Sequence, residues 1–170
     1  MPFSFTVSAV IPVGAREIYD AWLNGKTHAR MTGTKAAKAS TVVGGAHEAW
    51  SGYSFGRNLK LVPGRRIVQS WRTVEFAPED ADSEIDIRLA ASPRGTRLTL
   101  VHSNVPDGHT GYRRGWIDYY FVPMKAFFAE RAKSRTAAKP RAKAKVKAKV
   151  KAKARQGRKP SGAGRKAVRQ

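Results

Sequence analysis

The sequence contains no cysteine, and this absence removes several kinds of chemistry at once. Disulfide bonds, thiolate metal sites and a cysteine nucleophile are all excluded. No apolar run approaches the length that crosses a membrane. Residues 1–13 also lack the basic segment of a signal peptide, since the first positive side chain is Arg16. We therefore expect a cytoplasmic protein that has no membrane partner.

Acidic residues are missing from the last part of the chain. Residues 133–170 hold 16 Lys and Arg and no Asp or Glu, whereas residues 1–132 hold 17 basic and 12 acidic residues. The whole chain has a formal charge of +21, of which +16 falls in the last segment. That segment also lacks aromatic residues, so it cannot bury enough apolar surface to fold alone. The sequence predicts a globular domain over residues 1–132 and a disordered basic tail over residues 133–170.

The tail alternates Lys with Ala or Val, a composition that resembles the tails of linker-histone-like and nucleoid proteins. Such side chains neutralise phosphates and release counterions, but they do not read base edges. A solubilising tail and a membrane-surface contact are the alternatives, although the membrane contact would lack a bulky apolar anchor. We predict non-specific nucleic-acid binding, with nucleoid association as its consequence, by Lys143, Lys145, Lys147, Lys149, Lys151, Lys153, Arg155, Arg158 and Lys159.

The periodicity of apolar residues in the domain predicts an α+β fold. Residues 3–10 alternate as a strand, and residues 15–24 carry a helical stripe, followed by a short helix or an irregular link. From Lys38 onward the period changes to two, with a hairpin expected over 38–43 and 46–51 and further strands as far as Ser103. This order favours an antiparallel sheet that carries helices on one face.

A long amphipathic helix is predicted after the strands. The stretch over residues 110–128 combines many aromatic residues with a helical period, which gives one broad apolar face. Pro123 interrupts this stretch, and we expect it to kink the helix rather than end it. The sheet should therefore curl around this helix.

Three segments together resemble a known family: NLKLVPGRRIVQSWR (58–72), TRLTLVHSNVPDG (96–108) and GWIDYYFVPMKAFF (115–128). They are similar to activators of the heat shock protein 90 ATPase, of the C-terminal-domain type, in the START-like or birch-pollen-allergen-like (SRPBCC) superfamily. The resemblance covers about residues 3–130. It implies a helix-grip fold, in which a curved antiparallel sheet wraps around a long C-terminal helix and leaves a cavity. The separate N-terminal domain of the eukaryotic activator is expected to be missing.

The resemblance implies an apolar ligand, because superfamily members bind lipids, sterols, polyketides and similar molecules, and some are enzymes. Periodicity cannot distinguish a hollow interior from a filled one, so full packing of the same side chains stays an alternative. We predict that a ligand cavity is lined by Trp50, Trp71, His102, Trp116, Tyr120, Phe121 and Met124.

The sequence patterns that could indicate a catalytic or a metal site are weak. The Gly-x-Ser-x-Gly pattern over residues 52–56 would need a strand-to-helix elbow in a parallel sheet, whereas the residues after it alternate as a strand. None of the four histidines has i,i+4 spacing with another, which argues against a metal site. Six of the 12 acids fall between Glu75 and Asp86, where solvated carboxylates are more common than a paired site. We expect no catalytic residue, no metal and no cofactor.

Three functions follow from these observations. The first is a non-enzymatic START-like domain that binds a hydrophobic small molecule or a protein, tethered to nucleic acid by its tail. The second is a co-chaperone-like regulator of a heat shock ATPase. The third is an enzyme that uses the cavity, as a cyclase or a hydrolase would.

Overall fold

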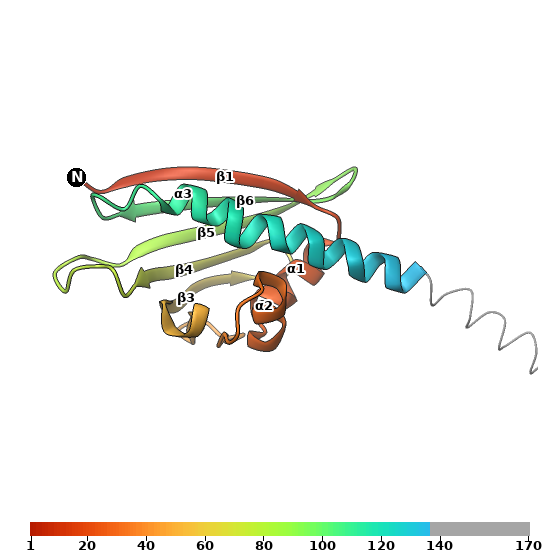
Figure 1. Cartoon of the computed structure of the whole chain (residues 1–170), viewed down its shortest axis with the longest axis horizontal. Helices are drawn as coiled ribbons and strands as arrows, with labels where there is room; N and C mark the ends of the chain where they lie inside the picture. The colour runs from red at the N-terminus through yellow and green to blue at the C-terminus, as the bar shows by residue number, and fades with distance from the viewer. Residues whose placement is uncertain (137–170) are drawn as a thin grey trace, which may run out of the picture. The chain divides into compact units, whose positions relative to one another are not determined.

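The computed structural model describes residues 1–136, and in them six antiparallel strands form one curved sheet (Figure 1). Strands that follow one another in the chain lie side by side, except that β1 pairs with β6. Both edges of the sheet are therefore early strands. In sheet order the strands are β1 (Phe3–Ile11), β6 (Gly95–Val105), β5 (Ser83–Ser92), β4 (Arg66–Thr73), β3 (Ser54–Val62) and β2 (Ala46–Ala49).

Two short helices, α1 (Ala15–Trp22) and α2 (Gly25–Thr32), connect β1 to the rest of the sheet. The side chain of Asn24 accepts a hydrogen bond from the backbone N–H of Thr27 at 2.9 Å and so caps the start of α2. Gly33 ends α2 in the left-handed conformation, with a φ of 73°. The segment predicted as a helix or an irregular link is thus a helix.

The long helix begins at α3 (Tyr112–Gly115), passes through the π-helical segment η2 (Trp116–Phe121) and continues over 122–136. Figure 1 shows it running along the sheet. Pro123 does not end the helix, as predicted, and the irregularity lies just before it. There the N–H of Val122 donates to the carbonyl of Ile117, five residues back, which is the π-helical pattern.

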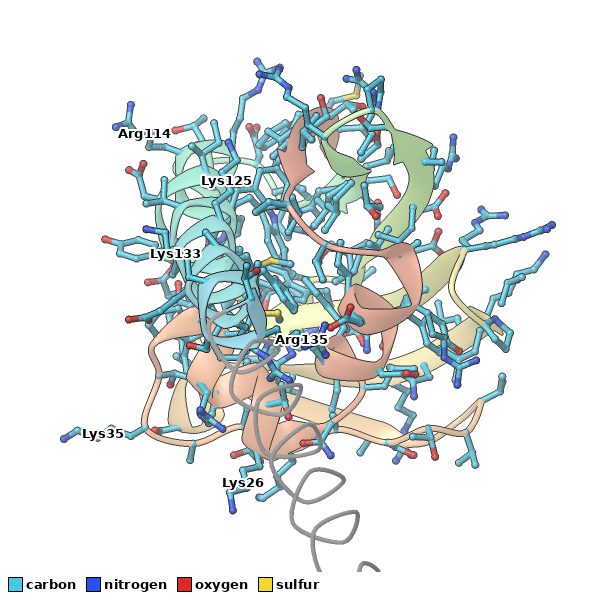
Figure 2. The ribbon with its side chains drawn as sticks, turned by 90° about the vertical axis from the view of Figure 1, so that its right-hand side faces the viewer. Lys26, Lys35, Arg114, Lys125, Lys133 and Arg135 are labelled. Atoms are coloured by element: carbon cyan, nitrogen blue, oxygen red, sulfur yellow. The ribbon has the colours of Figure 1, made fainter. Side chains whose placement is uncertain are left out.

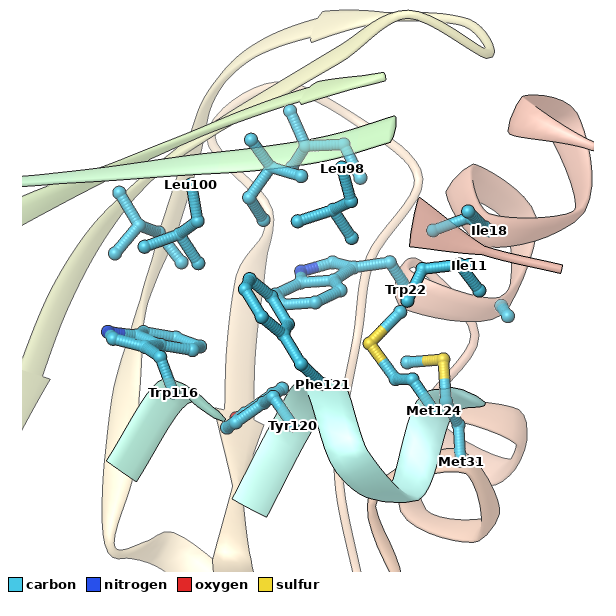
Figure 3. Packing of buried hydrophobic residues seen from close by; sticks show 14 of the residues in the cluster. Ile11, Ile18, Trp22, Met31, Leu98, Leu100, Trp116, Tyr120, Phe121 and Met124 are labelled. Atoms are coloured by element: carbon cyan, nitrogen blue, oxygen red, sulfur yellow. The ribbon is translucent and has the colours of Figure 1, made fainter. Parts of the chain in front are cut away.

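The hydrophobic core packs between this helix and the sheet. Figure 3 shows Phe121 and Met124 of the helix pointing toward the sheet and toward Trp22 of α1 and Met31 of α2. Complete burial of one such side chain stabilises a fold by about 1.5–3 kcal/mol. Figure 2 shows Arg114 on the side of the helix that is turned away from the sheet, and Lys125 is exposed as well. The predicted α+β, helix-grip fold is confirmed.

The strand predicted over residues 38–43 is wrong, since only one isolated bridge, between Lys38 and Glu48, forms there. The side-chain amide of Asn58 takes the backbone carbonyls instead, because its Nδ2 donates to Ser40 at 2.8 Å and to Val42 at 3.0 Å. Alternating residues in a sequence cannot reveal that a side chain will satisfy these groups.

A buried polar chain extends from Asn58 to the first helix. Its Oδ1 accepts from Gln69 Nε2 at 2.8 Å, and Gln69 Oε1 accepts from the indole N–H of Trp22 at 3.1 Å. Each side-chain nitrogen and oxygen in this chain has at least one hydrogen-bond partner, which limits the cost of burying the amides. The chain links α1, β4, β3 and the segment before β2.

No helix in residues 1–136 is both long enough and apolar enough to span a membrane.

Candidate functional site

One end of the space between the long helix and the sheet is hollow. A pocket of about 540 Å³ opens there, which is within the usual range for small-molecule sites. Its walls come from the turn before β3, from β4 and the turn after it, and from the start of the long helix. The lining residues are Trp50, Tyr53, Ser54, Trp71, Glu75, Gly111, Tyr112, Gly115, Trp116, Tyr119 and Tyr120.

Aromatic rings form most of the wall and contact one another. The centroids of Trp116 and Tyr120 lie 4.5 Å apart, and the ring of Trp71 lies edge-on to Tyr112 at 5.0 Å. Trp50 lies edge-on to Tyr119 at 5.7 Å. These spacings fall within the range in which aromatic pairs attract each other. The rings therefore support one another around the hollow rather than closing it.

Trp50 reaches the pocket from a strained turn. Trp50 and Ser51 both have a φ of 56°, and Gly52 has a φ of 93°, so three consecutive residues are left-handed. A left-handed residue other than glycine costs roughly 1–2 kcal/mol. The turn is held by a hydrogen bond of 3.2 Å from the N–H of Ser51 to the carbonyl of Ala36. Strain of this kind is concentrated at functional sites, and here it places an indole at the wall of the pocket.

A second hydrogen-bond chain fixes the other wall. The indole N–H of Trp116 donates to His102 Nδ1 at 3.0 Å, and His102 Nε2 lies 2.8 Å from Ser83 Oγ. Ser83 Oγ in turn donates to the carbonyl of Trp71 at 2.6 Å. An indole N–H can only donate, so Nδ1 is the acceptor and the proton of neutral His102 sits on Nε2. Burial lowers the pKa of His102 to about 3, which keeps the ring neutral.

The hydroxyls of Tyr112 and Tyr120 also stay protonated. Burial raises the pKa of Tyr120 to about 12, although hydrogen bonds with Trp50 and Ser54 act in the opposite direction. Burial likewise raises the pKa of Tyr112, whose hydroxyl lies 2.7 Å from Thr73 Oγ1. These hydroxyls are hydrogen-bonding groups rather than bases at neutral pH.

The structure brings four of the predicted cavity residues together: Trp50, Trp71, Trp116 and Tyr120 line the pocket. The other three do not line it. His102 lies behind Trp116 and Trp71 with both ring nitrogens occupied, and Phe121 and Met124 are packed in the core. The apolar face of the helix is longer than the pocket, so Phe121 and Met124 share that face without reaching the cavity.

Sequence reasoning missed seven lining residues. Tyr112 and Tyr119 lie four residues before and three residues after Trp116, so helical spacing could have placed them beside it. Tyr53 and Glu75 stand in turns, where periodicity gives no signal. The remaining three are Ser54, Gly111 and Gly115.

The hydrolase pattern and the histidines have structural roles. Ser54 is the first residue of β3 in an antiparallel sheet, not a strand-to-helix elbow. His28 Nδ1 contacts the carbonyl of Trp22 at 3.0 Å, and His47 Nε2 contacts that of Ser70 at 2.9 Å. In residues 1–136, no group of three His, Asp or Glu side chains is arranged to hold a metal ion. The predicted nucleic-acid residues, from Lys143 to Lys159, lie outside the described residues.

The family model of "Activator of Hsp90 ATPase homolog 1-like protein" matches residues 12–129 of the chain. No curated protein shows a significant sequence match.

Several solved structures are similar to the domain. A structure described as an HSP90 activator from Plasmodium falciparum has a TM-score of 0.67 and 21% identity, over 75% of this chain and 96% of that one. The structure of a protein from Chromobacterium violaceum has a TM-score of 0.61 and 26% identity, over 75% of this chain and 98% of that one. The structure of the Aha1 dimer from Colwellia psychrerythraea has a TM-score of 0.60 and 17% identity, over 74% of this chain and 92% of that one. The resemblance of the domain to this family, stated from the sequence, is confirmed.

Because His102 and His28 are buried, we expect the free energy of unfolding to depend on pH. Burial lowers the pKa of His102 to about 3 and that of His28 to about 4, from 6.5. Below about pH 6.5 these two histidines bind protons in the unfolded chain but stay neutral in the folded chain. The free energy of unfolding should therefore fall as the pH drops toward about 4, by up to about 1.4 kcal/mol per pH unit for each histidine.

Urea unfolding at several pH values measures this dependence, and the His102→Gln variant is the comparison. The variant should be less stable at neutral pH, and its stability should fall less steeply with acid because one of the two buried histidines is gone. Contributions from carboxylates are common to both proteins. Parallel pH profiles would show that His102 is not a buried neutral group.

Proposed function

This chain belongs to the family of Activator of Hsp90 ATPase homolog 1-like proteins, and from that premise we propose that its START-like domain binds an apolar small molecule without transforming it. The observation that carries the proposal is the pocket of about 540 Å³, seven of whose lining side chains are aromatic. Sites that bind drug-sized ligands have this size and this apolar character, with a few polar groups that fix orientation.

The polar groups near the pocket favour binding over catalysis. A general base needs a pKa near the working pH, whereas burial has moved the pKa of His102 to about 3 and that of Tyr120 to about 12. Ser54 is buried and lies on a strand without a histidine as hydrogen-bond partner in the described part of the chain. The chemistry available at the wall is hydrogen bonding, aromatic contact and the charge of one carboxylate, that of Glu75.

A neutral fluorescent probe such as N-phenyl-1-naphthylamine should bind saturably, and the Gly111→Phe variant should weaken it by about tenfold or more by filling the pocket. Gly111 lines the pocket, its φ is −70°, and an added Cβ would meet no atom within 4 Å. The fold should therefore accept the substitution.

Gly14→Phe is the matched control. Gly14 has a φ of −68° and equal space around an added Cβ, but it lies outside the pocket. Its variant should bind the probe as the unchanged protein does. If neither variant alters the titration, or if the unchanged protein shows no saturable binding, the pocket is not the site.

A second candidate is regulation of a heat shock ATPase. It is favoured by the family description and by the likeness to a Plasmodium falciparum HSP90 activator. Rates of ATP hydrolysis by an Hsp90-type chaperone, measured with and without the full chain, decide between the candidates. Stimulation that Gly111→Phe leaves intact would assign chaperone regulation to a surface other than the pocket.

The basic tail supplies a further part of the proposal, which is non-specific binding to nucleic acid. Residues 133–170 carry 16 Lys and Arg and no acid, while the domain has a formal charge of only +5. Neutralising phosphates with such side chains releases counterions, and this release drives binding without base readout.

The full chain should therefore bind duplex DNA much more tightly than a chain that ends at residue 132. If about 6–10 tail charges meet phosphates, the affinity should drop by roughly 10³–10⁵ between about 50 and 200 mM salt. A tail of scrambled order and equal composition is the control, and it should bind equally well. Equal binding by the full and shortened chains, or binding that ignores salt, would contradict the proposal.

A further inference from the structure

We propose that the pocket selects ligands that carry an organic cation, such as a quaternary or alkylated ammonium group, on an apolar body. This inference rests on the proposed function, because it names the ligand class for the same pocket. It is carried by two independent features of the wall: the arrangement of aromatic faces and the position of one carboxylate.

The aromatic feature is a set of rings that meet at several angles. Trp71 and Tyr112 are nearly perpendicular, at 82°, while Trp71 and Trp116 are tilted by 48° with centroids 5.7 Å apart. Trp50, in the turn before β3, lies edge-on to Tyr119 of the long helix, with an angle of 72° between the two ring planes. The faces of aromatic rings are negative, and a cation within about 6 Å of a centroid is attracted, most strongly by Trp. A cage of several rings offers a cation more than one face.

The carboxylate feature is Glu75, which follows β4 and lines the pocket. The hydroxyl of Tyr112 donates to Glu75 Oε2 at 3.3 Å. Burial and the nearby Glu75 carboxylate also raise the pKa of Tyr53, so that hydroxyl stays neutral too. The formal charge of the lining is then that of Glu75 alone, since no Lys, Arg, Asp or second Glu is among the residues that form it.

Glu75 has no ion-pair partner within residues 1–136, although arginines lie near in the sequence and the fold. Arg72 is held by the carbonyls of Ala77 and Asp80 and by the carboxylate of Asp82. Arg114 pairs with Asp118 at 2.6 Å and points outward from the long helix (Figure 2). The negative charge at the pocket is therefore left for a ligand to neutralise.

These two features set an order of affinities. A neutral apolar ligand gains contact with the rings but nothing from Glu75. An anionic ligand meets the negative ring faces and the carboxylate, both of which repel it. A cationic ligand gains from both, and an alkylated ammonium suits the site because its methyl groups pack against rings while its charge is weakly hydrated.

Phenyltrimethylammonium and tert-butylbenzene test the inference, because they have the same shape and differ in charge. Titrations of the full chain, followed by tryptophan fluorescence or calorimetry, should give a dissociation constant about tenfold lower for the cation. Glu75→Gln should remove most of this preference and leave tert-butylbenzene unaffected. Glu79→Gln removes the same charge from a residue that is exposed, as Glu75 is, but lies outside the pocket, and it should change neither affinity.

A second variant tests the rings without endangering the fold. Tyr119 is 60% exposed, so Tyr119→Leu keeps apolar bulk and removes the aromatic ring together with its hydroxyl. It should weaken the cation several-fold more than it weakens tert-butylbenzene.

The outcomes separate the two levels of the proposal. Equal affinity for both probes, or a preference that survives Glu75→Gln, overturns the cation inference and leaves the apolar site standing. Binding of neither probe overturns both. Cation binding that Glu79→Gln reduces as much as Glu75→Gln does would show long-range attraction only and would also overturn the inference.

Discussion

The hydrogen-bond chain that runs from Trp116 through His102 and Ser83 to the backbone of Trp71 joins the long helix to the sheet. Its distances of 3.0, 2.8 and 2.6 Å leave no donor or acceptor of the imidazole unused. Because it is buried, each link is stronger than it would be in water, and a broken link would be costly. Since Trp116 and Trp71 both line the pocket, the chain fixes two of its walls.

The remaining walls depend on this fixed pair. Tyr112 and Tyr120 pack against Trp71 and Trp116, so their positions follow from the chain. Trp50 arrives independently from its left-handed turn and contacts Tyr119 and Tyr120. A pocket built in this way is held open by ring contacts and one strained turn. Because the walls are already ordered, the protein loses less conformational entropy when a ligand binds.

Much of the fold could be predicted from the sequence, because the features that set it are local. The alternation along β1 and β6 and the helical stripe of the long helix follow directly from the pattern of apolar residues. The strand expected over residues 38–43 could not be judged in this way. Its carbonyls are satisfied by Asn58, which lies far along the chain.

The site was only partly predictable, for a different physical reason. Trp116 and Tyr120 share a helix face with Phe121 and Met124, and no local pattern says where along that face packing ends and a hollow begins. The sheet and the short helices decide this: Met31 of α2 lies beside Met124 in the filled part, and Trp22 of α1 stacks on Tyr120 at 5.4 Å (Figure 3). Glu75 could not be distinguished from the other acids of its segment, because only the fold brings it to the pocket.

The hydrogen-bond chain requires one protonation state and one tautomer of His102, and both can be measured. Heteronuclear NMR of the imidazole nitrogens reports which nitrogen holds the proton and whether the ring titrates. We predict a neutral ring with its proton on Nε2 at about pH 5, well below the ordinary pKa of about 6.5, and a slowly exchanging indole proton on Trp116. A ring that titrates near 6.5, or one with its proton on Nδ1, would contradict the hydrogen-bond chain on which the pocket depends.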